Sequence, residues 1–107
     1  MDVFGKWKVV KVFSDFTPEL QPIYVSKDEA LALDQYKDSD SVRFISSIYE
    51  ITNKGINLFN EKNEVVQTFK VKEEDGKLYL DEGEKVEIKL NDDGTITFII
   101  MLILARI

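Results

Sequence analysis

The stretch from residue 95 to residue 107 constrains the fold more than any other part of this sequence. It begins with threonine at every second position, which gives one face of the expected strand a polar character, and it is apolar on both faces from Ile99 onward. A strand of this kind needs a core on one side and a cover on the other. We therefore expect the rest of the chain to be arranged around a closing strand in this stretch.

The two faces of this closing strand predict two different contacts. One face contains Ile96, Phe98, Ile100, Leu102, Leu104 and Arg106. A cation on the core side needs a partner, and Trp7 on the first expected strand can supply an indole face worth about 1 to 2 kcal/mol when partly desolvated. The other face contains Ile99, Met101, Ile103 and Ile107. A helix or a second subunit is expected to cover it, so a homodimer formed through this strand is one hypothesis.

Composition limits the classes of function that are open to the chain. Its 107 residues are enough for a single domain with one core, which we assign to residues 1–107. The formal net charge of −6 gives no basic surface for nucleic acid or for anionic lipid. The sequence has no His and no Cys, so imidazole and thiol catalysis are excluded and the usual zinc ligands are missing. We expect no catalytic residues, no metal and no cofactor.

Acidic residues cluster at the expected turns, where turn formation and solubility explain them. The Asp38-Ser39-Asp40 segment has oxygen ligands at alternate positions, but it lacks the glycine and the distal glutamate of a calcium loop. We expect the protein not to be an enzyme.

No basic and apolar leader precedes the first expected strand, which favours a cytoplasmic protein, although a secreted protein after removal of its leader would look the same. The apolar run over residues 95–107 is too short for a helix that crosses a bilayer, and its β-branched residues favour a buried strand. We expect no membrane partner.

Alternating apolar residues predict a mainly β chain. Strands are expected over residues 5–13, 42–52, 56–59, 65–72, 77–80, 85–90 and 95–107. The phase of the first strand slips, which predicts a bulge near Val9 and Val10. Ser26 and Glu29 form a capping-box pattern before a helix over residues 27–36, whereas no strand is expected between residues 14 and 41.

Short turns that contain glycine connect the later strands, including Asn53-Lys54-Gly55, whose glycine can take a positive φ angle. Such turns favour an antiparallel meander. The fold class that we predict is a small up-and-down β-barrel of about seven or eight strands, with a short helical segment between strands one and two.

The motif Gly5-Lys6-Trp7, together with Arg106 on the last strand, resembles the calycin superfamily, which contains the lipocalins, the fatty-acid-binding proteins and small bacterial lipocalin-like domains. In that superfamily a Gly-x-Trp motif lies on the first strand and a cation from the last strand packs across the tryptophan. The resemblance spans nearly the whole chain. It implies a lipocalin-like barrel closed by Gly5, Trp7 and Arg106, and a non-enzymatic protein that holds a small hydrophobic ligand.

Aromatic residues are the candidates for contact with such a ligand. We predict that a cavity under the helix is lined by Phe44, Tyr49, Phe69 and Phe98. The polar groups expected to fix a ligand there are Gln67 and Tyr79. A fully packed interior would use the same residues. The alternative function is therefore a protein–protein interaction or inhibitor module with a filled barrel.

Overall fold

Strands dominate the computed structural model of the chain, which describes residues 3–16, 19, 21–99 and 101–107. The strands are β1 (Gly5–Phe16), β2 (Pro22–Ser26), β3 (Ile48–Ile51), β4 (Ile56–Phe59), β5 (Val65–Phe69), β6 (Val71–Glu74), β7 (Lys77–Glu82), β8 (Glu84–Ile88), β9 (Ile96–Phe98) and β10 (Leu102–Arg106). The helices are α1 (Lys27–Ala32), the 3-10 helix η1 (Asp34–Tyr36) and α2 (Ser39–Ser46). The prediction of a mainly β chain with a short helical segment is confirmed.

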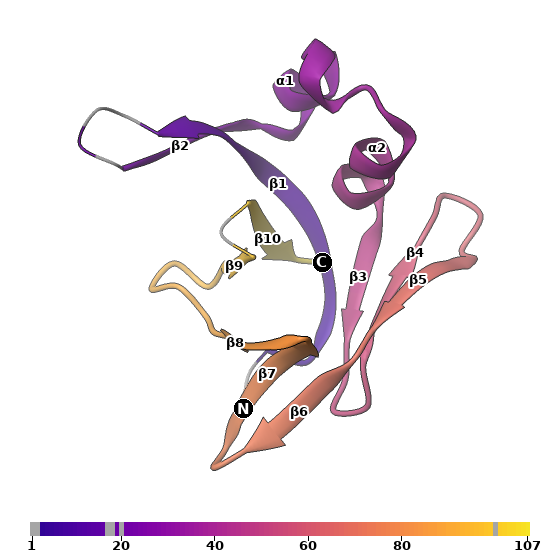
Figure 1. The fold of residues 1–107 in the computed structure, drawn as a ribbon. Coiled ribbons are helices and arrows are strands. Elements are labelled where there is room, and N and C mark those ends of the chain that lie inside the picture. The colour runs from indigo at the N-terminus through magenta and orange to yellow at the C-terminus, as the bar shows by residue number, and fades with distance from the viewer. Residues whose placement is uncertain (1–2, 17–18, 20, 100) are drawn as a thin grey trace.

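The strands form two antiparallel sheets rather than one continuous ring of paired strands. The larger sheet has seven strands in the order β5-β4-β3-β1-β10-β9, with β2 paired to β1, and the smaller sheet has the order β6-β7-β8. Figure 1 shows β1 as the long central strand of the larger sheet. Its register with β10 shifts between Val9 and Lys11, so the predicted bulge is confirmed.

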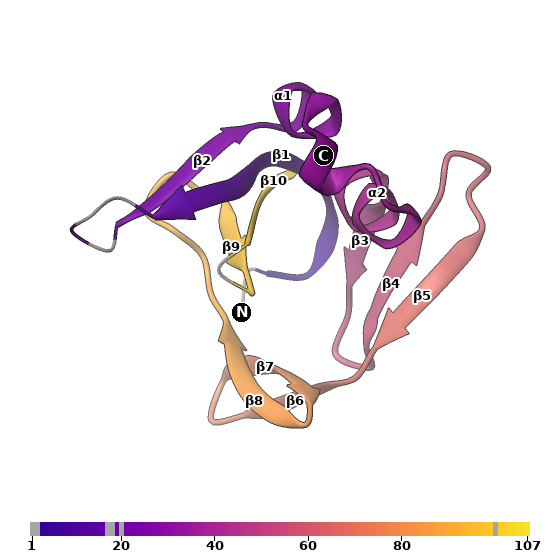
Figure 2. The same cartoon turned by 45° about the horizontal axis from the view of Figure 1, so that its top comes forward.

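Both sheets contribute to one hydrophobic core. Trp7 and Leu104 come from the larger sheet and Leu78 from the smaller one, and all three side chains are fully buried. Figure 2 shows the two sheets curving around a common interior, with α1 and α2 beside β1 and β3. The helices therefore lie next to the core to which both sheets contribute.

The prediction of one continuous closing strand over residues 95–107 is wrong, because the chain reverses within it. β9 and β10 pair with each other as a hairpin, and the amide of Met101 donates to the carbonyl of Phe98 at 3.1 Å. Ile99 takes a positive φ angle of 55° in this turn. The stretch over residues 95–107 is thus two short strands and the turn between them, and Ile100 lies outside the described residues.

The prediction of a strand over residues 42–52 is also wrong in its first half. Residues up to Ser46 form α2, and only Ile48–Ile51 form the strand β3. Asp38 caps the helix by accepting a hydrogen bond from the amide of Ser41 at 3.0 Å. This cap outweighs the β-propensity of Val42, Phe44 and Ile45.

Two further boundaries differ from the predictions. β2 lies where no strand was expected, and Pro22 is tolerated there because it begins the strand. The helices consequently lie between β2 and β3 rather than between the first two strands.

The expected strand over residues 65–72 divides at Lys70, where the chain leaves the larger sheet for the smaller one. The carbonyl of Lys70 accepts a hydrogen bond from the amide of Asp81 at 2.9 Å.

Ser26 caps α1, since the amide of Glu29 donates to its hydroxyl, and that hydroxyl donates to the carboxylate of Glu29 at 2.9 Å. The helix ends at Ala32 rather than at residue 36, because Leu33 is extended. The Thr52–Gly55 turn forms as expected, but its glycine is not in the positive φ region. A Cβ atom on Gly55 would lie 3.0 Å from the carbonyl oxygen of Phe69, so close approach of backbone explains the glycine.

Candidate functional site

A cavity of about 200 Å³ lies between α2, η1 and the larger sheet. Its lining comes from seven elements and from the turn between β9 and β10. The lining residues are Val12, Tyr36, Ser41, Phe44, Ile45, Tyr49, Phe69, Phe98, Ile99, Met101 and Leu102. Most of these side chains are aliphatic or aromatic, and none carries a charge.

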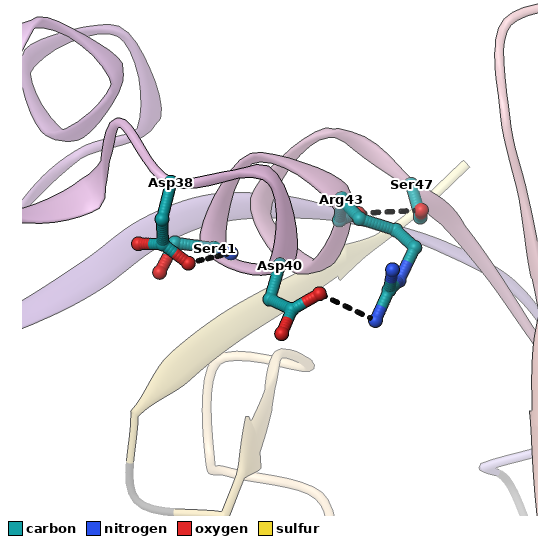
Figure 3. A network of polar contacts seen from close by, with 5 residues as sticks. All are labelled: Asp38, Asp40, Ser41, Arg43 and Ser47. Carbon is teal, nitrogen blue, oxygen red and sulfur yellow. Dashed lines mark hydrogen bonds and ion pairs between the residues drawn. The ribbon is translucent and has the colours of Figure 1, made fainter.

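Helix α2 brings Ser41, Phe44 and Ile45 to the cavity. The spacing of three and four residues places these side chains on one face of a helix. Figure 3 shows the polar contacts that hold the helix at its two ends. Asp38 caps the first turn, and the hydroxyl of Ser47 donates to the carbonyl of Arg43 at 2.6 Å at the other end.

Electrostatics at the start of α2 favour an ionised cap. Hydrogen bonds from the side chain and the backbone of Ser41 lower the pKa of Asp38 below its ordinary value. Asp40 pairs with Arg43 at 3.2 Å (Figure 3), and the guanidinium carbon of Arg43 lies 5.3 Å from the ring centroid of Phe44. The carboxylates of the segment that was considered for calcium are thus engaged in capping and in an ion pair.

Four aromatic rings follow one another around the cavity. Phe44 and Phe69 are stacked with centroids 6.1 Å apart, and Phe69 and Phe98 are tilted at 6.0 Å. Tyr49 meets Phe98 edge to face at 5.4 Å. Such offset and edge contacts are favourable arrangements of aromatic rings. They fix the ring faces that a bound molecule would meet.

The hydroxyl groups at the cavity already have protein partners. The hydroxyl of Tyr49 donates to the carbonyl of Phe44 at 2.7 Å, and the hydroxyl of Tyr36 donates to the carbonyl of Phe13. Burial raises the pKa of Tyr49 above its ordinary value of 10.0, because the phenolate would be desolvated. The cavity therefore presents an apolar interior.

Four of the six residues predicted to contact a ligand line this cavity, namely Phe44, Tyr49, Phe69 and Phe98. Tyr79 does not, because it alternates along β7 with the buried Leu78 and Leu80 and lies instead 5.0 Å from the ammonium of Lys85. Gln67 is half-buried opposite Leu58 on β4 and is also not part of the lining. The structure therefore brings the predicted rings together but not the predicted polar groups.

Several lining residues were missed by the sequence analysis. Ile45 was assigned to a strand, on the face opposite Phe44, and Ser41 was assigned to the polar segment that precedes this strand. The helical spacing of these three residues after a capping aspartate was the available signal. Val12 and Leu102 carried no local signal, because only the pairing of β1 with β10 places them side by side.

The three residues proposed for barrel closure lie together at a different place. Arg106 is directly opposite Trp7 across the β1–β10 pair, and its guanidinium carbon lies 4.3 Å from the indole centroid. Its Nη1 donates to the carbonyl of Phe4 at 2.7 Å, and the indole of Trp7 donates to the carbonyl of Val3 at 3.0 Å. The tryptophan is fully buried, whereas Arg106 is exposed and covers it from the solvent side.

Gly5 allows this close contact. It has a φ angle of +125°, and a Cβ atom at this position would lie 2.9 Å from Nη1 of Arg106. A side chain would therefore strain the backbone and also displace the guanidinium.

Among the described residues, no group of three or more Asp, Glu, His or Cys side chains is placed to hold a metal ion. Within the same part of the chain, the helices are all too short or too polar to span a bilayer. Comparison with family models, curated proteins and solved structures gave no match, so the comparisons do not identify a family.

Proposed function

We propose that this chain is a non-enzymatic binding protein that holds a small apolar molecule in the cavity beneath α2. The observation that carries the proposal is the convergence of Phe44, Tyr49, Phe69 and Phe98 on one cavity with no charged side chain in its lining. Apolar pockets of this kind are the usual sites of small hydrophobic ligands. The exposed Ile99 and Met101 side chains give the cavity an apolar mouth at the β9–β10 turn.

The proposal includes a small lipocalin-like barrel formed by the two sheets together. Lys70 joins β5 to β6, and a bridge between Leu90 and Ile96 joins the chain after β8 to β9. The end strands of the larger sheet, β5 and β9, are therefore both connected to the smaller sheet. Within the larger sheet, the contact of Trp7 with Arg106 supports the pairing of β1 with β10. This arrangement is similar to the closure that the Gly-x-Trp motif and the terminal arginine have in calycins.

Ligand binding can be tested by thermal unfolding with a panel of neutral apolar probes of increasing size. A ligand that binds only the folded chain raises the unfolding midpoint as its concentration rises. Native mass spectrometry of protein purified from its own host would report any bound molecule and the oligomeric state. A panel without any stabilising probe, together with an empty native species, would contradict the proposal.

An interaction module is the second candidate function, and exposed apolar side chains favour it. Met101 and Ile107 are 50% and 65% exposed. β10 itself is paired on both sides, so a second copy of the chain would cover side chains rather than add a strand to β10. Sedimentation at two protein concentrations tests this candidate, because a monomer at both concentrations argues against a homodimer.

A further inference from the structure

The cavity limits the size of the molecule that it can hold. An apolar cavity of about 150 Å³ is known to accept benzene, whereas pockets for drug-sized ligands measure about 300 to 1,000 Å³. The volume of about 200 Å³ lies close to the first case. A single ring fits within this space, whereas a long acyl chain would extend beyond it.

The same cavity also selects against charge. Its hydroxyl groups are engaged, because those of Tyr36 and Tyr49 donate to backbone carbonyls and that of Ser41 interacts with Asp38. A carboxylate inside would find no cation in the lining, and burial of an unpaired charge is very unfavourable. The formal net charge of −6 further opposes the approach of an anion.

The arrangement of the rings favours an aromatic ligand over an alkyl one. Phe44 and Phe69 are nearly parallel at 22°, while Phe69 and Phe98 make an angle of 56°. The lining thus contains rings at several inclinations, against which an added ring can pack by offset stacking or by edge contact. Met101 at the mouth adds a polarisable thioether, which also contacts aromatic rings favourably.

We infer that the ligand of this cavity is a neutral molecule with a single aromatic ring. The inference rests on the proposed function, because it names the class of ligand for the same cavity. It makes three separate demands on the ligand: small size, absence of charge and aromatic character.

Four probes separate these demands in titrations of the full chain followed by NMR of the backbone amides. Toluene is a neutral ring, benzoate adds a carboxylate to the same ring, and dodecanol is neutral but long. We expect toluene to bind with saturating shifts in α2 and β3, benzoate to bind at least about tenfold more weakly, and dodecanol not to bind. Cyclohexane, a neutral ring that is not aromatic, tests the aromatic character and should bind more weakly than toluene.

The outcomes distinguish this inference from the proposed function. Binding of dodecanol, binding of benzoate as tight as that of toluene, or binding of cyclohexane as tight as that of toluene would overturn the inference but leave an apolar binding protein. If none of the four probes binds, the proposed function fails as well.

A matched pair of variants on α2 locates the binding. Ser41→Phe fills the cavity from the helix and keeps the backbone amide that Asp38 caps, so we expect toluene affinity to fall by at least about tenfold. Val42→Phe places the same side chain at the next, exposed position outside the cavity and should leave the affinity unchanged. Unchanged affinity in Ser41→Phe would overturn the inference.

Met101→Trp provides the same test if Ser41→Phe does not fold, because residue 101 lies at the mouth and is half exposed. The larger side chain should narrow the mouth and weaken toluene binding. Full affinity in this variant would place the bound ring elsewhere and overturn the inference.

Discussion

Tyr49 combines complete burial with a hydrogen bond to the carbonyl of Phe44. Burial raises its pKa in the folded state above the value in the unfolded chain. The folded state therefore binds this proton more tightly, so its contribution to stability is complete below about pH 10 and is lost as the pH rises further.

We expect the free energy of unfolding to fall more steeply above pH 10 in the wild type than in Tyr49→Phe, by at most about 1.4 kcal/mol per pH unit. Near pH 8 the variant should be less stable by about 1 kcal/mol, because the hydrogen bond is lost. Urea unfolding at a series of pH values measures both effects. Tyr79→Phe is the control, because Tyr79 lies in the smaller sheet on the face opposite the buried Leu78 and Leu80. An equal change of slope in both variants would contradict the assignment to Tyr49.

Gly5 is a second residue with a specific physical requirement. Gly5→Ala should lower the free energy of unfolding by about 1 to 3 kcal/mol, because it adds backbone strain and a steric conflict with Arg106. Gly76→Ala is the matched control, since Gly76 also has a positive φ angle but no atom lies within 4 Å of its added Cβ.

Denaturant unfolding of both glycine variants, alone and in an Arg106→Ala background, separates strain from the steric conflict. The cost of Gly5→Ala should decrease when the guanidinium is absent, whereas the cost of Gly76→Ala should not change. Identical costs in the two backgrounds would show that Arg106 does not restrict Gly5.

At the scale of single elements, α2 depends on its cap. Asp38→Ala removes the acceptor for the amide of Ser41 and should lower both the thermal midpoint and the affinity for an apolar ligand, because the helix carries part of the cavity lining. Asp38→Asn keeps an oxygen acceptor and should lie closer to the wild type.

The pH dependence provides a check on this role of Asp38. Its pKa is lowered in the folded state, so the stabilisation is present above the ordinary pKa of 3.8 and is lost as the pH falls through the folded value. Thermal unfolding followed by circular dichroism should therefore show the wild type approaching Asp38→Asn in acid. A constant difference between these two proteins across that range would contradict the prediction.

Elements with strong local signals could be predicted from the sequence, and those set by distant pairing could not. The N-cap at Ser26 and the bulge near Val9 leave a local pattern, and both are present. Helix α2 was missed because Val42 and Phe44 favour a strand and the capping pattern at Asp38 was not recognised. The reversal after Phe98 was missed because a β-branched residue, Ile99, adopts a positive φ angle that such residues rarely take.

At the scale of the whole molecule, the site was predicted in its aromatic part only. Phe44, Tyr49, Phe69 and Phe98 were recognisable because large apolar side chains seek the interior wherever the strands place them. Gln67 and Tyr79 were not distinguishable by composition, because the face of a strand on which a residue lies depends on register. The extent of the cavity follows from how β1 meets β10, which no local pattern records.

The pairing of β1 with β10 also affects how the chain can fold. The hydrogen bond from Arg106 to the carbonyl of Phe4 joins residues 102 positions apart, and β1 pairs along its length with β2, β3 and β10. Contacts so distant in sequence slow folding, because a large loop must close before they form. During synthesis on a ribosome, β1 would have to wait with one edge unpaired until β10 had left the exit tunnel.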